Sequence, residues 1–132
     1  MDERTGSIRH ARHYSVEQAN AALPWVSERL GRIRDALAEL VSAESTEALE
    51  LIDTDHGGGY PGRAVAGATL ALLAAASELQ AVDIVLRDPQ SGLLDFPSIR
   101  AGEEVYLCWR PGEDRVAWWH DPEGGFAGRQ PL

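Results

Sequence analysis

The chain has 132 residues, 44% of them apolar and 25% charged, which suits one globular domain. Its 12 basic residues are all arginines and stand against 21 acidic residues, for a net charge of −9. The lack of lysine excludes a Schiff-base lysine, a pyridoxal phosphate site and a P-loop, and the single Cys108 excludes an intrachain disulfide and an all-cysteine metal site. The acidic balance argues against nucleic acid and anionic membranes as partners.

Residues 1–13 are polar and lack the apolar stretch of a secretory signal. We predict a flexible N-terminal tail, followed by one domain over residues 14–132. The longest apolar run, Ala64–Ala76, is shorter than the ~20 residues that cross a bilayer. We therefore expect a bacterial, cytoplasmic protein without a membrane segment.

Two helices are predicted over residues 14–82. Ser15 and Gln18 form a capping box, and apolar residues then recur in alternating steps of four and three, as in a coiled coil. The first series is Ala19, Leu23, Val26, Leu30, Ile33, Leu37 and Leu40. The second, starting near Arg63, is Val65, Ala68, Leu72, Ala75, Leu79 and Val82. Such series predict an antiparallel helical hairpin. Its connection, residues 44–62, is expected to hold one extra turn and a flexible acidic loop at His56–Gly59.

Apolar residues outside these two series predict an oligomer. They are Val16, Ala22, Val41 and Leu51 on the first helix and Leu70 and Leu73 on the second. A small sheet cannot cover them all, so we expect a homodimer formed through the helices.

Residues 83–132 show the two-residue period of strands. Short strands are expected at 84–87 and 94–96, and a hairpin joins 104–110 to 115–120. Pairing Arg110 with Arg115 gives an inner face of Val105, Leu107, Trp109, Val116, Trp118 and His120. The outer face then holds Glu104, Tyr106, Cys108, Arg110 and Trp119. A slip of one residue would move Trp118 and His120 to the opposite face. The fold class is thus α+β, a long antiparallel helical hairpin packed on a small antiparallel sheet.

Several segments resemble the uncharacterised bacterial family called domain of unknown function 2203. They are Gly92–Pro97, Glu104–Arg110, Trp119-His120, Gly125–Leu132 and, in the first helix, Tyr14–Asn20 with Leu23-Pro24. The resemblance covers nearly the whole chain. It implies no particular activity, but it favours the β half and the C-terminal tail as the place where residue identity matters.

The outer face of the hairpin is the first candidate binding surface. Arginine offers a planar fork to carboxylates and phosphates, while tryptophan and tyrosine offer flat apolar area. We predict a non-enzymatic binding module, with a small anion captured by Arg110 and Arg129. The candidate ligand-binding residues are Asp95, Tyr106, Arg110, Trp119, His120 and Arg129. The structural alternative is an aromatic pair of Trp119 with Tyr106, and Arg110 bonded to Asp95 or Glu104.

A metal-dependent enzyme is the second reading. Together with Asp95, Glu104 and Cys108, His120 offers suitable atoms for zinc or iron, and the enzyme would use His120, Asp95 and Cys108. No ligand-spacing motif joins these residues, and we expect no cofactor. In the predicted register Cys108 and His120 point to opposite faces, which disfavours a nucleophile–base pair. A third reading is a structural dimer without a ligand, in which Arg110 and Arg129 are paired within the protein.

The C-terminal tail is predicted to fold back on the sheet. We expect Phe126 to be buried, and Arg129 to pair with Asp95, Glu104 or a bound anion.

Overall fold

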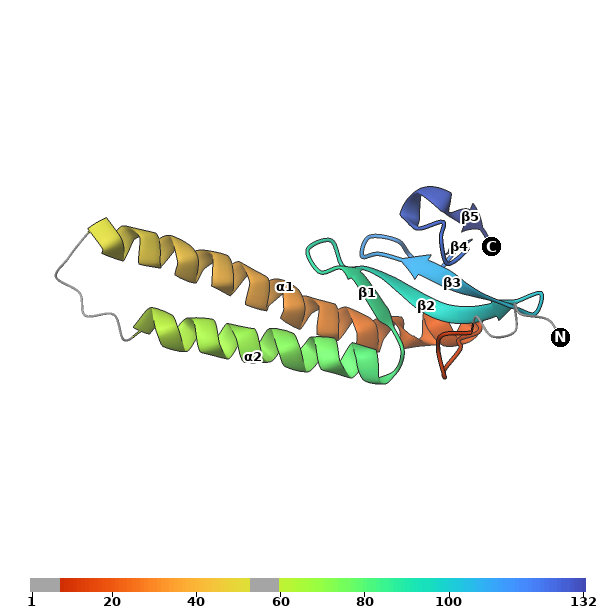
Figure 1. The fold of residues 1–132 in the computed structure, drawn as a ribbon, viewed down its shortest axis with the longest axis horizontal. Coiled ribbons are helices and arrows are strands. Elements are labelled where there is room, and N and C mark those ends of the chain that lie inside the picture. The colour runs from red at the N-terminus through yellow and green to blue at the C-terminus, as the bar shows by residue number, and fades with distance from the viewer. Residues whose placement is uncertain (1–7, 53–59) are drawn as a thin grey trace.

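The computed structural model describes the backbone of residues 8–52 and 60–132. Two antiparallel helices lead into a five-stranded antiparallel sheet, so the α+β prediction is confirmed (Figure 1). The elements are α1 (Val16–Ile52), α2 (Tyr60–Ala81), β1 (Val85–Asp88), β2 (Leu93–Arg100), β3 (Glu103–Trp109), β4 (Trp118–His120), a 3-10 turn η2 (Phe126–Gly128) and β5 (Gln130–Pro131). The strands lie in the sheet in chain order.

Helix α1 begins with the expected capping box. The Ser15 backbone N–H donates to Gln18 Oε1 at 2.9 Å, and the Gln18 backbone N–H donates to Ser15 Oγ at 3.1 Å. The helix continues to Ile52, beyond the predicted start of the connection at residue 44. The expected extra turn is therefore part of α1. The predicted loop at His56–Gly59 lies outside the described residues.

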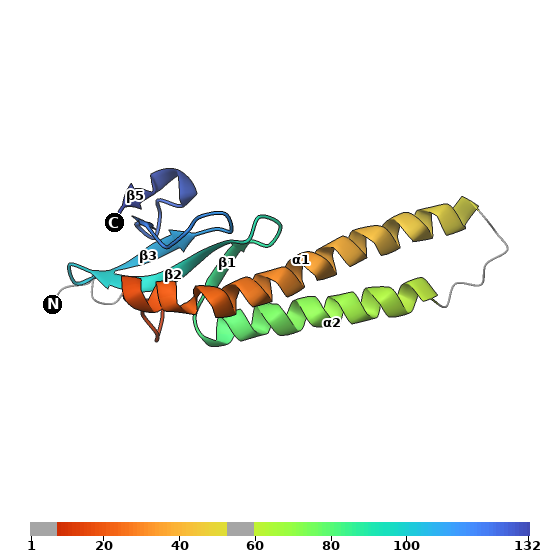
Figure 2. The same ribbon diagram turned by 180° about the vertical axis from the view of Figure 1, so that it is seen from behind.

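The core lies between one face of the sheet and the nearest ends of the helices, which are the start of α1 and the end of α2. Figures 1 and 2 show the sheet beside one end of the helical pair, whose other end projects well beyond it. The core residues come from both helices and the inner strands: Ala19, Val26, Leu30, Ile33, Ala75, Leu79, Ile84, Leu94, Phe96, Leu107, Trp109 and Val116. Members of both predicted helical series are among them, which supports the helical pairing.

The register of the last hairpin differs from the prediction by one residue. Tyr106 pairs with His120, Leu107 with Trp119, and Cys108 with Trp118. The expected pairs Leu107–Trp118 and Val105–His120 are wrong. The connection is longer than the predicted four-residue turn: β4 begins at Trp118, and the Val116 backbone N–H donates to Asn20 Oδ1 of α1 at 2.8 Å rather than to β3. Trp118 and His120 therefore lie on the outer face, away from the helices, and Trp119 on the inner one.

Residues 8–13, assigned above to the flexible tail, contact the outer face of the sheet. The backbone N–H groups of Arg9 and His10 donate to the Glu104 carboxylate at 2.9 and 3.1 Å. The chain then reaches the part of β2 that β1 does not cover, where the Tyr14 backbone N–H donates to the Pro97 carbonyl oxygen at 2.7 Å.

The C-terminal tail also folds back, but by other contacts than expected. Strand β5 pairs with β4, and the Leu132 backbone N–H donates to the Ala117 carbonyl oxygen at 2.9 Å. The prediction that Phe126 is buried is wrong, since 43% of it is exposed. Arg129 pairs with Glu113 and not with Asp95 or Glu104. The reason is that β5 lies beside β4, next to the β3–β4 connection that carries Glu113.

Candidate functional site

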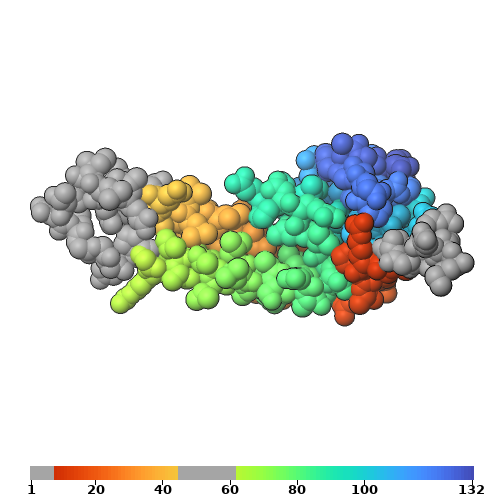
Figure 3. All heavy atoms as spheres, viewed as in Figure 1, coloured from red at the N-terminus to blue at the C-terminus, as the bar shows by residue number. Residues whose placement is uncertain are grey.

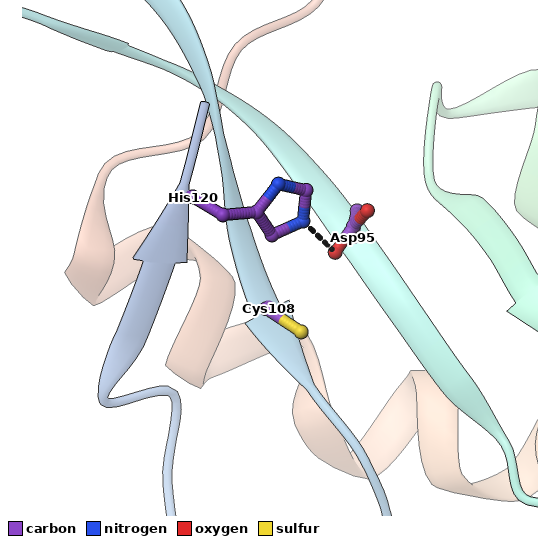
Figure 4. A group of neighbouring side chains, drawn as sticks. All are labelled: Asp95, Cys108 and His120. Carbon is purple, nitrogen blue, oxygen red and sulfur yellow. Dashed lines mark hydrogen bonds and ion pairs between the residues drawn. The ribbon is translucent and has the colours of Figure 1, made fainter. Parts of the chain in front are cut away.

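Three side chains from three neighbouring strands converge on the outer face of the sheet. Asp95 of β2 pairs directly with Cys108 of β3, and His120 of β4 stands one pleat away, opposite Tyr106. All three side chains are buried, and one ligand atom from each lies within 4.8 Å of the others. Figure 4 shows them pointing into the same space. The expectation that Cys108 and His120 face opposite sides is wrong, because it depended on the shifted register.

His120 is held between two hydrogen-bond acceptors. Its Nδ1 lies 2.7 Å from the Asp121 carbonyl oxygen, so Nδ1 carries a proton and donates it. Its Nε2 lies 3.0 Å from Asp95 Oδ1, and an ionised carboxylate is also only an acceptor. The contact between Nε2 and Oδ1 therefore needs a positive centre between the two atoms, which is either a shared proton or a bound cation.

The other oxygen of Asp95 is held by a residue that the sequence analysis missed. Arg87 Nε donates to Asp95 Oδ2 at 2.7 Å, and the Arg87 guanidinium lies over the Tyr106 ring, 4.9 Å from its centroid. Burial lowers the pKa of Arg87, but the bond and charge of Asp95 outweigh it, so the pKa is raised. The available signal is that Arg87 lies two residues after Val85, on the same face of a predicted strand, but only the β1–β2 register shows that this face is the one that carries Asp95.

Cys108 is a protonated thiol in this environment. Burial first, and the neighbouring Asp95 charge second, raise its pKa to about 12. Only the thiolate is a strong nucleophile, so Cys108 is inert as a nucleophile in the metal-free protein. A thiol bound to a metal ion loses its proton outright.

The cluster forms the floor of a pocket of about 250 Å³. Apart from the three cluster residues, its lining comes from β1, the start of β2 and the C-terminal tail: Arg87, Leu93, Pro122, Glu123, Gly125 and Phe126. Phe126, expected in the core, thus forms part of the wall. A molecule in this pocket would lie directly above Asp95, Cys108 and His120.

Tyr106 links this cluster to the N-terminal segment. Its ring lies 5.5 Å from that of His120, and its hydroxyl lies 2.9 Å from His10 Nε2. Beside it, Glu104 accepts from His13 Nε2 at 2.8 Å. Burial raises the pKa of Glu104, but the bonds from His13 and from the Arg9 and His10 backbones outweigh it and lower the pKa. The segment is therefore fixed over the outer face by an ionised carboxylate.

The remaining predicted ligand residues lie elsewhere. Arg110 and Arg129 stack on Phe126, 4.9 and 4.7 Å from its ring centroid, and Arg129 Nη2 donates to Glu113 Oε2 at 2.5 Å. Trp119 lies on the opposite face of the sheet, with the Arg100 guanidinium 4.6 Å from its ring. Of the six residues, the structure brings together Asp95, Tyr106 and His120. The expected pairs of Trp119 with Tyr106 and of Arg110 with Asp95 or Glu104 are absent from the described residues.

The comparisons with known proteins identify a family without assigning an activity. No curated protein and no solved structure matches the chain. The family model described as an uncharacterized conserved protein, DUF2203, matches residues 12–132. That range includes every strand, both helices and all three residues of the buried cluster. The chain therefore belongs to the DUF2203 family.

Proposed function

We propose that this protein binds a transition-metal ion of the zinc type through Asp95, Cys108 and His120, and that the bound ion faces the pocket as a reactive centre. The observation that carries the proposal is the convergence of a carboxylate, a thiol and an imidazole at the floor of an open pocket. These are the three ligand types that zinc takes in proteins.

The distances are compatible with such an ion. Tetrahedral zinc at ~2.0–2.3 Å from its ligands requires ligand atoms roughly 3.3–3.6 Å apart. The Nε2–Oδ1 separation is 3.0 Å, and no separation in the cluster exceeds 4.8 Å. Side-chain shifts of about 1 Å or less therefore suffice.

The surroundings of the three side chains support the proposal. The Nδ1–H of His120 donates to a backbone carbonyl, which directs the Nε2 lone pair toward Asp95 and the ion. Arg87 holds Asp95 Oδ2 and leaves Oδ1 for the ion. When His120 carries no proton on Nε2, Nε2 and Asp95 Oδ1 are two acceptors that face each other. An ion placed between them would bind both.

The number of ligands favours a reactive site over a structural one. Structural zinc sites are closed by four protein ligands, whereas catalytic sites use three and keep one position for water or substrate. Here three protein ligands lie below a pocket of about 250 Å³. A metal-bound water in that position would be acidified and available to attack a substrate. The rival proposal, capture of a small anion by Arg110 and Arg129, has less support because Arg129 is already paired with Glu113.

The test is metal binding by the full chain, first stripped with a chelator and then given cobalt as a spectroscopic substitute for zinc. We expect one ion per chain after desalting, and a near-ultraviolet thiolate-to-cobalt charge-transfer band that Cys108→Ser abolishes. His120→Gln should weaken binding strongly, while His13→Gln, the matched loss of a histidine outside the cluster, should leave it unchanged. Circular dichroism checks that each variant is folded. Failure of the unmodified chain to retain the ion, or equal losses in the two histidine variants, would refute the proposal.

A further inference from the structure

The outward side of α2 is apolar and carries no charge over most of its length. Leu70 and Leu73 are 68% and 59% exposed. The other exposed residues between Arg63 and Glu78 are small: Ala66, Gly67, Ala71, Ala74 and Ser77. Figure 3 shows α2 as an uncovered surface along the helical pair. We call this set of exposed residues the α2 stripe: Ala66, Gly67, Leu70, Ala71, Leu73, Ala74 and Ser77.

Helix α1 presents a different exposed surface at the same levels of the helical pair. The two helices are antiparallel, and Arg29 of α1 bonds to Glu78 of α2 at 3.2 Å, which fixes their alignment. Counting along both helices from that pair sets Arg34 level with Leu73, and Glu39 level with Ala68. Arg34, Asp35 and Glu39 are all exposed. The α2 stripe therefore lies beside a stretch of α1 whose exposed surface carries charged side chains.

This arrangement favours a protein partner over lipid. By length and composition alone, Gly62–Ala81 could cross a membrane, with a mean hydropathy of 1.4. A bilayer that took in α2 would also take in the charged residues of α1 at the same depth, which is costly. A partner that covers only the α2 stripe leaves those charges in water.

We infer that the partner is a second copy of this chain, with its α2 packed antiparallel on the first about a two-fold axis near Leu70 and Ala71. Such an axis sets Leu70 against Ala71 of the partner subunit, and by symmetry Ala71 against Leu70 of the partner subunit. Each of these two contacts packs a large side chain on a small one. It also brings Arg63 level with Glu78 of the partner subunit, and the Glu78 side chain is 41% exposed beyond its bonds to α1. Only the two α2 helices would then touch, and α1 of each copy would keep its charged surface in water.

The dimensions indicate a weak dimer. The stretch Gly62–Ala81 is about 30 Å long and a helix is about 10–12 Å wide, so the contact covers a few hundred Å² on each copy. Stable interfaces bury about 800 Å² per partner, so this contact is less than half that size and we expect a weak, reversible dimer. Of the residues predicted to form the interface, Val41, Leu70 and Leu73 are exposed, Val16 and Ala22 pack against the core, and the Leu51 side chain lies outside the described set.

The experiment is sedimentation of the full chain across about 1–100 µM, a range in which weak, reversible association changes the measured mass. We expect reversible dimers, at least tenfold weaker association for Leu70→Glu, and no change for Ala38→Glu, which adds the same charge to an exposed position on α1. Because the proposed axis sets residue 70 against residue 71 of the other copy, mixing Leu70→Glu with Ala71→Arg should restore dimers. Circular dichroism confirms that the variants fold.

Three results would overturn the inference. The first is a monomer at every concentration. The second is a dimer unaffected by Leu70→Glu, which would place the interface elsewhere. The third is a monomer that co-sediments with phosphatidylcholine vesicles, which would identify lipid as the partner. None of these results depends on whether the chain binds a metal.

Discussion

Replacing Asp95 by alanine in the metal-free protein tests whether this carboxylate holds the outer face of the sheet together. The side chain is buried and bonds to both Arg87 and His120. Removing one member of a buried ion pair costs about 3–5 kcal/mol. The Arg87 side chain is 42% exposed and can turn to solvent once it loses its partner, so we expect a loss near 3 kcal/mol. At roughly 3 °C per kcal/mol for a chain of this size, the Tm should fall by about 10 °C.

The matched control is Asp95→Asn, which keeps the shape of the side chain. The asparagine oxygen can accept from Arg87, and its amide can donate to Nε2 of a neutral His120. The loss should therefore be half that of the alanine variant or less. Urea unfolding followed by the fluorescence of the 4 tryptophans measures both changes. A loss below about 1 kcal/mol for Asp95→Ala, or equal losses in the two variants, would show that the two bonds do not stabilise the fold as argued.

The remaining predictions concern stability and thiol chemistry. Leu30→Ala should lower the free energy of unfolding by about 2–5 kcal/mol, because Leu30 lies in the core. Glu39→Gln, at an exposed position, should lower it by less than about 0.5 kcal/mol, and equal losses in urea unfolding would contradict the helical packing. Deleting residues 124–132 should lower the Tm by several degrees, since β5 and the Arg129–Glu113 pair are lost, and an unchanged Tm would show that the tail contributes nothing. The pKa of Glu104 is lowered on folding, so its stabilising effect is complete above the unfolded value near 4.5 and is lost as the pH falls through the folded value. Glu104→Gln should therefore flatten the loss of stability in acid, and an identical pH profile would argue against this. At neutral pH, Cys108 should react with iodoacetamide at a negligible rate until the protein unfolds, because its pKa is about 12 and it is buried; fast labelling of the folded chain would contradict that pKa.

The helical half of the fold could be predicted because its signal is long and local. The alternating steps of four and three residues recur over many turns, and the Ser15–Gln18 capping box marks the start. Each further turn that keeps the alternating steps of four and three confirms the same face of the helix, so the position of that face is well determined. The helical hairpin follows from it directly, and the α+β class follows when the two-residue period of residues 83–132 is added.

The site could not be predicted because its strand register goes with contacts between residues distant in the sequence. The sequence between Arg110 and Arg115 looks like a four-residue turn, but Val116 bonds to Asn20 of α1 and leaves the ladder. Strand β4 is shifted by one residue from the predicted register, and His120 lies on the face of Cys108. Asn20 is distant in the sequence, so no local pattern reports this contact. Asp95, Cys108 and His120 were recognised as suitable ligands, but not as neighbours.

X-ray absorption at the zinc edge of the zinc-loaded full chain tests the central claim most directly. The account predicts one sulfur neighbour at ~2.3 Å together with nitrogen and oxygen neighbours at ~2.0–2.2 Å. The sulfur contribution should vanish in Cys108→Ser. A coordination shell made only of nitrogen and oxygen in the unmodified chain would contradict it.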